Sequence, residues 1–158
     1  MKLPQQQASV PGPGRRLGID VGSVRVGVAL SDPAAILASP LATLTRDRRG
    51  RTDIDALAAL VTEHEVVEVV IGLPRTLAGR HGQAAREAEA YAAVLAGRIG
   101  VPIQLVDERL TTARATRALA ERGVRGRRQR AVVDQAAAVE ILQTWLEYRR
   151  CCGREADR

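Results

Sequence analysis

One acidic residue, Asp20, interrupts the otherwise apolar run from Leu17 to Val21, which opens a longer stretch that ends at Asp32. Valine, isoleucine, leucine and alanine dominate both sides of Gly22-Ser23, which is typical of two short strands joined by a turn. A carboxylate in an apolar strand costs free energy unless another group compensates it. Two interpretations stay open: Asp20 caps a local Asx turn, or it holds a cation or phosphate where Gly22 lets a ligand approach the backbone.

The apolar spacing predicts three strands followed by alternating helices and strands. Short links between the strands at 15–21, 24–31 and 36–44 favour an antiparallel meander, in which Pro40 fits an edge or a bulge. This order predicts an α/β fold with a mixed five-stranded sheet and helices on both faces. The remaining elements are expected as strands at 66–72 and 101–106 and as helices near 54–61, 83–99, 111–121 and 131–149.

A chain of 158 residues favours one domain. We expect a flexible tail at 1–14, the domain at 15–149 and a flexible tail at 150–158. The sequence holds neither a long apolar run nor an apolar signal-peptide core, which predicts a cytoplasmic protein without a membrane partner. The adjacent Cys151 and Cys152 lie too close to bridge each other, although an exposed pair can link two chains under oxidation.

The charge is concentrated in one segment. The chain carries a net charge of +6 and lacks Phe, so nucleic acid is the favoured partner but base stacking on aromatic rings is scarce. A run of positive charge between residues 114 and 130 is usually a solvated surface. Here the run would also flank the acidic residues and hold a phosphate backbone. Its seven arginines, against a single Glu121, are Arg114, Arg117, Arg122, Arg125, Arg127, Arg128 and Arg130.

Asp107 and Glu108 follow the predicted strand at 101–106. Carboxyl ends of parallel strands meet at one edge, so these carboxylates and Asp20 are expected near each other. Because neighbouring residues of an extended chain point to opposite sides, at most one of the two faces Asp20. The alternative is a surface turn in which Asp107 or Glu108 pairs with Arg109.

Asp134 is the more informative acidic residue. At helical spacing it shares a stripe with Ala138, Ile141, Trp145 and Tyr148, so it lies on the apolar face. The helix dipole explains an aspartate in a first turn, but not one that faces the core. We therefore favour a functional role for Asp134.

Carboxylates from two strand ends and a helix can converge on hard divalent cations. Magnesium prefers oxygen ligands, and two such ions about 4 Å apart promote phosphodiester cleavage by water. Neither His64 nor His81 has ligand-like spacing, which disfavours zinc hydrolysis and nucleophilic triads. We expect Mg²⁺ or Mn²⁺ as cofactor, in a two-ion site, with Arg25, Arg109 and the arginine run on the phosphates.

Four blocks occur in order along the chain. They are Asp20-Val21-Gly22-Ser23 with Arg25 to Ala29 and Ser31-Asp32, then Gly72-Leu73-Pro74, then Asp107 to Thr112, and then Val133 to Ala137 with Ile141-Leu142. With these blocks the chain resembles the YqgF family, also called RuvX, over nearly all of residues 15–149. One departure lies in the loop after Pro74, where Arg75 to Gly79 replaces the asparagine and Asp-Gly or Asn-Gly common in the family.

The resemblance implies an RNase H-like fold and a nuclease with metal-binding carboxylates Asp20, Glu108 and Asp134. It favours Glu108 over Asp107, which spacing alone leaves open. It also implies hydrolysis of nucleic acid, either in maturing the 5′ end of precursor 16S ribosomal RNA or in cutting branched DNA such as Holliday junctions. A homodimer suits a two-fold branched substrate, whereas one site is enough for an RNA end.

Two other functions stay open from the sequence. A non-catalytic RNA-binding factor in assembly of the small ribosomal subunit would use the arginine run equally well, but leaves Asp134 unexplained. An actin-like phosphotransferase would use Asp20-Val21-Gly22, but such enzymes need two domains of this fold, and the chain supplies one.

Overall fold

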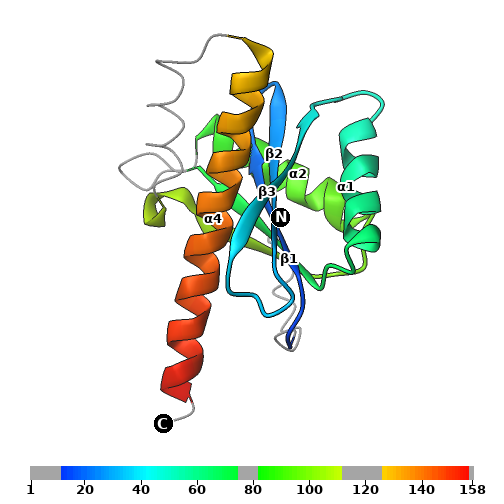
Figure 1. The fold of residues 1–158 in the computed structure, drawn as a ribbon. Helices are drawn as coiled ribbons and strands as arrows, with labels where there is room; N and C mark the ends of the chain where they lie inside the picture. The colour runs from blue at the N-terminus through cyan, green and yellow to red at the C-terminus, as the bar shows by residue number, and fades with distance from the viewer. Residues whose placement is uncertain (1–11, 75–81, 112–125, 157–158) are drawn as a thin grey trace.

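The structure is a computed structural model that describes residues 12–74, 82–111 and 126–156 (Figure 1). Its strands are β1 (Arg16–Val21), β2 (Arg25–Ser31), β3 (Ala38–Thr45), β4 (Glu68–Leu73) and β5 (Ile103–Asp107). Its helices are α1 (Thr52–Glu63), α2 (Gln83–Ala96), the short 3₁₀ helix η1 (Glu108–Leu110) and α4 (Arg127–Ala156).

The five strands form one mixed sheet in the order β3-β2-β1-β4-β5. β1 pairs antiparallel with β2, and β2 with β3, whereas β1–β4 and β4–β5 are parallel. The predicted mixed five-stranded sheet and the antiparallel meander are therefore confirmed. β1 is the central strand of the sheet, and the carboxyl ends of the parallel strands β1, β4 and β5 lie at the same end of the sheet.

Pro40 lies where the sheet tolerates it. β3 is an edge strand, and the register slips beside Pro40, since Val28 pairs with Ala42 but Ala29 pairs with Pro40. A proline at a bulge of an edge strand removes no hydrogen bond that a neighbour needs. The expected edge or bulge position is confirmed.

Helices cover both faces of the sheet, as predicted (Figure 1). On one face Ile19, Val28 and Ile71 pack in a core with Leu57 of α1 and Leu95 of α2. On the other face Ala29 and Val70 pack with Ile141 and Leu142 of α4. Alternate residues of each strand feed the two cores, because successive side chains of a strand point to opposite faces.

The predicted ends of the last helix are wrong. α4 begins at Arg127 rather than Ala131 and continues to Ala156, so most of the expected tail at 150–158 is helical. The flanking segments are rich in arginine, glutamate and alanine, which favour helices. The exposed Cys151 and Cys152 therefore lie on α4.

The stripe predicted on that helix is only partly correct. Ala138 and Ile141 are fully buried, but Tyr148 is 68% exposed. The buried positions advance in steps of four, through Ala138, Leu142 and Leu146. Four residues exceed one helical turn by about 40°, so the contacting face moves around the helix and leaves Tyr148 on the surface.

The expected helix at 111–121 and most of the tail at 1–14 lie outside the described residues. Within the described ranges, none of the helices combines the length and apolar character needed to cross a membrane.

Replacement of Tyr91 by Phe should destabilise the fold. Burial, together with the negative charge of Asp53, raises the pKa of the Tyr91 hydroxyl, which stays protonated and donates to Asp53 Oδ2 at 2.9 Å. Asp53 is 4% exposed, so loss of this donor leaves a buried acceptor unsatisfied, at about 1–3 kcal/mol in the free energy of unfolding.

Urea denaturation measures this loss. Tyr148→Phe is the matched control, since its side chain is largely exposed and water can replace the lost contacts. Equal stabilities of the two variants would contradict the expected role of the buried hydroxyl.

Candidate active site

Asp20 lies near the carboxyl end of the central strand and is only 2% exposed. Its antiparallel partner on β2 is Gly27, and Gly72 follows Ile71, the parallel partner of Ile19, on β4. Residues side by side in a sheet share a face, so Asp20 points to the face that α4 covers. The turn after β1 is closed by the backbone, with Gly22 N donating to Arg25 O at 2.9 Å.

Gly27 lets α4 approach the sheet beside Asp20. A Cβ at this position would overlap the backbone carbonyl oxygen of Asp134. The absence of a side chain thus brings the first turns of α4 directly onto β2. The Asp134 carboxylate, with 16% of the side chain exposed, accepts a hydrogen bond from Arg25 Nε at 2.7 Å.

Gly72 provides the corresponding space on the other side of Asp20. A Cβ there would lie 3.1 Å from Glu108 Oε1, so the Glu108 carboxylate lies against β4 on the α4 face. Glu108 opens η1 directly after β5 and is 5% exposed. Two nearly buried carboxylates, Asp20 and Glu108, therefore share this end of the sheet.

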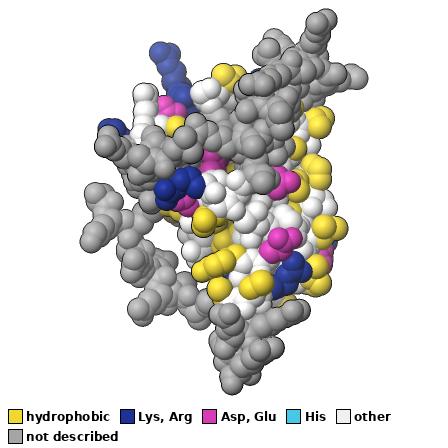
Figure 2. Space-filling view, turned by 90° about the vertical axis from the view of Figure 1, so that its left-hand side faces the viewer, with side chains coloured by type: hydrophobic (Ala, Val, Ile, Leu, Met, Phe, Trp, Pro, Cys, Tyr) yellow, Lys and Arg dark blue, Asp and Glu magenta, His cyan; other side chains and the backbone are white. Residues whose placement is uncertain are grey.

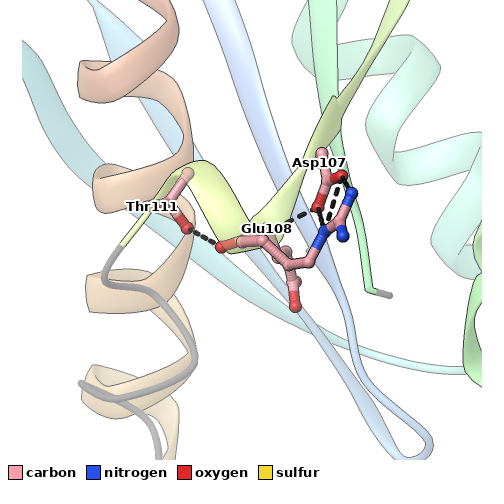
Figure 3. A network of polar contacts seen from close by, with 4 residues as sticks. Asp107, Glu108 and Thr111 are labelled. Atoms are coloured by element: carbon pink, nitrogen blue, oxygen red, sulfur yellow. Dashed lines mark hydrogen bonds and ion pairs between the residues drawn. The ribbon is translucent and has the colours of Figure 1, made fainter. Parts of the chain in front are cut away.

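Asp107 has a different environment from Glu108. Its carboxylate accepts from Arg109 Nε at 3.0 and 3.1 Å and from Nη2 at 2.6 Å (Figure 3). The hydrogen bonds to Asp107 raise the pKa of Arg109. Thr111 Oγ1 donates to the backbone oxygen of Glu108 at 3.0 Å and secures the turn. The local ion pair considered from the sequence thus involves Asp107, while Glu108 turns inward.

The three predicted ligands lie around one strand end without forming a closed cluster. Among the described residues, no three His, Cys, Asp or Glu side chains are close enough together to hold a metal ion. Arg25 occupies the Asp134 carboxylate and neutralises its charge. All three side chains offer carboxylate oxygens, the donors that Mg²⁺ and Mn²⁺ prefer, so the chemistry of the set fits a divalent cation.

The predicted phosphate contacts are only partly within the described chain. Arg25 and Arg109 are engaged with Asp134 and Asp107. Figure 2 views the molecule from the side of α4, where acidic and basic side chains are interspersed over the described surface. Arg127, Arg128 and Arg130 belong to the first turns of α4, and Arg114, Arg117, Arg122 and Arg125 lie outside the described residues.

Two glutamines whose side-chain hydrogen bonds position α4 were not anticipated from the sequence. Gln143 Oε1 accepts from Ala38 N at 2.8 Å, and its Nε2 donates to Ile36 O at 3.0 Å. Gln135 Nε2 donates to Thr43 Oγ1 at 3.1 Å. These side chains join α4 to β3 and its preceding loop. The sequence signal was present but weak: polar residues at helical spacing beside an apolar stripe.

A family model described as "RuvX: Holliday junction resolvase" matches residues 14–148. The chain belongs to the RuvX family. The predicted resemblance is therefore confirmed over residues 14–148.

Curated relatives of this RuvX-family chain share more than half of its residues. A protein of Mycolicibacterium paratuberculosis is 61% identical over 147 residues, covering 92% of this chain and 87% of the relative. One from Mycobacteroides abscessus is 56% identical over 148 residues, covering 93% and 89%. Both are named "Putative pre-16S rRNA nuclease".

Among solved structures, RuvC of T. thermophilus in complex with a Holliday junction substrate is similar in fold, with a TM-score of 0.54. It is 17% identical, and the match covers 87% of this chain and 96% of RuvC. The likeness confirms the RNase H-like fold of this RuvX-family chain.

Proposed function

We propose that this chain is a divalent-metal-dependent endonuclease that hydrolyses phosphodiester bonds in nucleic acid. The observation that carries the proposal is that the nearly buried Asp20 and Glu108 lie on the α4 face at one end of the sheet, where Gly27 lets the Asp134 backbone approach β2. Carboxylate oxygens are the ligands that Mg²⁺ and Mn²⁺ prefer in proteins. The family and the names of the relatives support nuclease chemistry at such a site.

Each carboxylate has a role in this proposal. Asp20 and Glu108 would hold the metal from the sheet, and Asp134 would complete the ligand set from α4. Two divalent ions, Mg²⁺ or Mn²⁺, would supply Lewis-acid activation of water and neutralise charge at the phosphate. The water, rather than a side chain, is the nucleophile in this scheme.

Arg25 would change partners when substrate and metal bind. In the structure its guanidinium pairs with Asp134, and 29% of its side chain is exposed. When Asp134 serves as a ligand, the Arg25 guanidinium would be available to contact a phosphate next to the scissile bond. Arg109 and the arginines between 114 and 130 would extend the contact along the backbone, giving affinity without sequence preference.

The names of the relatives and of the family model suggest two candidate substrates. The relatives are named for precursor 16S ribosomal RNA, and the family model for Holliday junctions. The decisive assay compares cleavage of a precursor 16S 5′-leader RNA with that of a synthetic four-way DNA junction. Preferred cutting of the RNA assigns rRNA processing, and preferred cutting of the junction assigns resolution, for which a homodimer is then expected. Binding of RNA without cutting either substrate supports the assembly-factor alternative instead.

Removal of divalent cations should abolish cleavage. EDTA should reduce the rate to background, and Mg²⁺ or Mn²⁺ added in excess should restore it, because no described side chain replaces the cation as an activator of water. Ca²⁺ at equal concentration is the control, since it takes oxygen ligands with a looser geometry and is expected to support binding but little cleavage. Full activity in EDTA would contradict the proposal.

A further inference from the structure

The turn between β1 and β2 connects two parts of the candidate active site. Asp20 lies two residues before Gly22, where the turn begins, and Arg25, which pairs with Asp134, ends it. Val24 within the turn is 60% exposed, so burial in a core does not fix this segment. A shift of the turn would move a proposed metal ligand and the partner of another ligand at the same time.

Residues that follow β3 bind all three backbone carbonyl groups of Gly22, Ser23 and Val24. Arg46 supplies two of the donors, since its Nη1 donates to Gly22 O at 3.1 Å and its backbone N donates to Val24 O at 2.9 Å. Arg48 Nη2 donates to Ser23 O at 3.3 Å. Three consecutive carbonyl groups of the turn are thus held from one side, and Arg46 makes the contacts at both ends.

Arg46 reaches the turn from the face of the sheet that lies opposite α4. Its guanidinium stacks over the Tyr91 ring of α2, with Cζ 5.3 Å from the ring centroid, and only 10% of its side chain is exposed. Tyr91 belongs to the core on this face. Glu87 Oε2 lies 3.5 Å from Arg46 Nη1 and 3.6 Å from Arg48 Nη2, so one carboxylate steadies both arginines. Arg46 is therefore placed to act on the turn rather than on a substrate.

The burial of a charged group at this position needs a reason. Desolvation of a guanidinium costs free energy, and apolar side chains of similar volume often serve as well or better in a protein interior. Methionine could cover the Tyr91 ring without that cost, but it has no donor for Gly22 O. The contact with the turn, rather than the packing of the core, therefore accounts for an arginine here.

We propose that Arg46 is a positioning residue of the active site, which holds the turn after β1 and thereby fixes Asp20 and Arg25 relative to each other. Loss of a residue that orients a metal ligand typically costs about 10- to 100-fold in metal affinity or activity. Arg46 acts on Asp20 through the backbone, so we expect the lower end of that range. The effect on metal and cleavage rests on the proposed nuclease function, whereas the effect on the turn does not.

Arg46→Met tests the proposal on the full chain, because it keeps a long apolar side chain over Tyr91 and removes the donor. In EDTA, the NMR order parameters of the Ser23 and Val24 amides should fall from rigid values of about 0.85 to below about 0.6. Calorimetric titration with Mn²⁺ should show roughly tenfold weaker binding. With Mg²⁺ present, kcat for cleavage should fall by a similar factor with little change in KM, since Arg46 is nearly buried.

Tyr91→Phe is the matched control, since it weakens the same region but leaves the aromatic ring beneath Arg46 and every contact with the turn. At a temperature where both variants are folded, Tyr91→Phe should keep the wild-type order parameters, Mn²⁺ affinity and kcat. Equal losses in the two variants would reduce Arg46 to a general contribution to stability and overturn the proposal. Wild-type Mn²⁺ affinity in Arg46→Met would overturn it as well.

Arg48→Met examines the same hold on the turn without removing a buried charge. The Arg48 side chain is 55% exposed, so its replacement should leave the stability of the fold almost unchanged. It should raise the mobility of Ser23 and weaken Mn²⁺ binding by a smaller factor than Arg46→Met does, because the two Arg46 contacts remain. Should Arg46→Met not fold, this variant decides, and wild-type mobility and affinity in it would refute the positioning role.

The wild-type protein separates this proposal from the nuclease function. Metal-dependent cleavage by the wild type, together with an unchanged Mn²⁺ affinity in Arg46→Met, would leave the nuclease proposal standing and refute the positioning role. Loss of turn rigidity in Arg46→Met, in a chain that binds no Mn²⁺ and cuts neither substrate, would refute the nuclease proposal while the hold on the turn stands.

Discussion

Replacement of Asp20 by Asn is expected to reduce the cleavage rate by more than about 100-fold. Loss of a residue that only hydrogen-bonds to a metal ligand typically costs about 10- to 100-fold, so a larger loss is expected for a ligand itself. Asp20 is the central carboxylate, with Gly27 beside it on β2 and β4 on its other side. Asparagine keeps the size of the side chain but removes the negative charge that binds the cation. Single-turnover cleavage with Mg²⁺ and Mn²⁺ measures the loss.

The same variant should keep its fold. Asp20 is 2% exposed, and asparagine has nearly the same size and shape and keeps one oxygen that can accept hydrogen bonds. We expect a free energy of unfolding in EDTA close to that of the wild type. RNA or junction binding should persist, since the arginines are unchanged.

Asp107→Asn is the matched control for Asp20→Asn. Asp107 pairs with Arg109 at the surface and has no place in the proposed ligand set. Its activity should stay within a few-fold of the wild type. Equal losses in the two variants, or full activity in Asp20→Asn, would contradict the carboxylate mechanism.

Replacement of Gly27 by Ala should destabilise the fold and impair the site together. The added Cβ would overlap the carbonyl oxygen of Asp134 on α4, and a backbone group cannot rotate away as a side chain can. α4 must then move from β2, which displaces the Asp134 carboxylate from Asp20. Overpacking of this kind costs about 1–3 kcal/mol, and we expect the upper end of that range.

Gly97→Ala is the control for this substitution. Gly97 has helical φ and ψ values at the end of α2, and a Cβ there would meet only Val94 O, at 3.5 Å. Alanine should be neutral or should stabilise by about 0.4–1 kcal/mol. Urea denaturation and cleavage assays on both variants test the prediction. A Gly27→Ala protein with wild-type stability and activity would show that α4 does not need this close approach.

Local patterns were sufficient to predict most of the fold. The change from strand to helix spacing after 36–44 correctly predicted the meander and the helices on both faces. Boundaries were less predictable, because arginine-rich segments suit a solvated loop and a helix end equally. α4 therefore starts four residues earlier than the predicted Ala131, at Arg127.

For the candidate site, the residue types were predictable but their partners were not. Alternation in the strand at 101–106 allowed only one of Asp107 and Glu108 to face Asp20, and the family resemblance favoured Glu108. In the structure Asp107 holds Arg109, and Glu108 lies against Gly72. The ion pair between Arg25 and Asp134 joins residues 109 positions apart, which no local pattern encodes.

The sequence by itself determined the sheet and the helices on both of its faces, and it singled out Asp20, Asp134 and one of Asp107 and Glu108 as candidate ligands, because hydrophobic periodicity and polar interruptions are local properties of the chain. Only the tertiary structure decided how α4 lies on β2, which carboxylate Arg25 neutralises, and that the buried Tyr91 hydroxyl donates to Asp53. Those features depend on backbone approach at Gly27 and on contacts between distant elements, and such contacts exist only once the chain is packed.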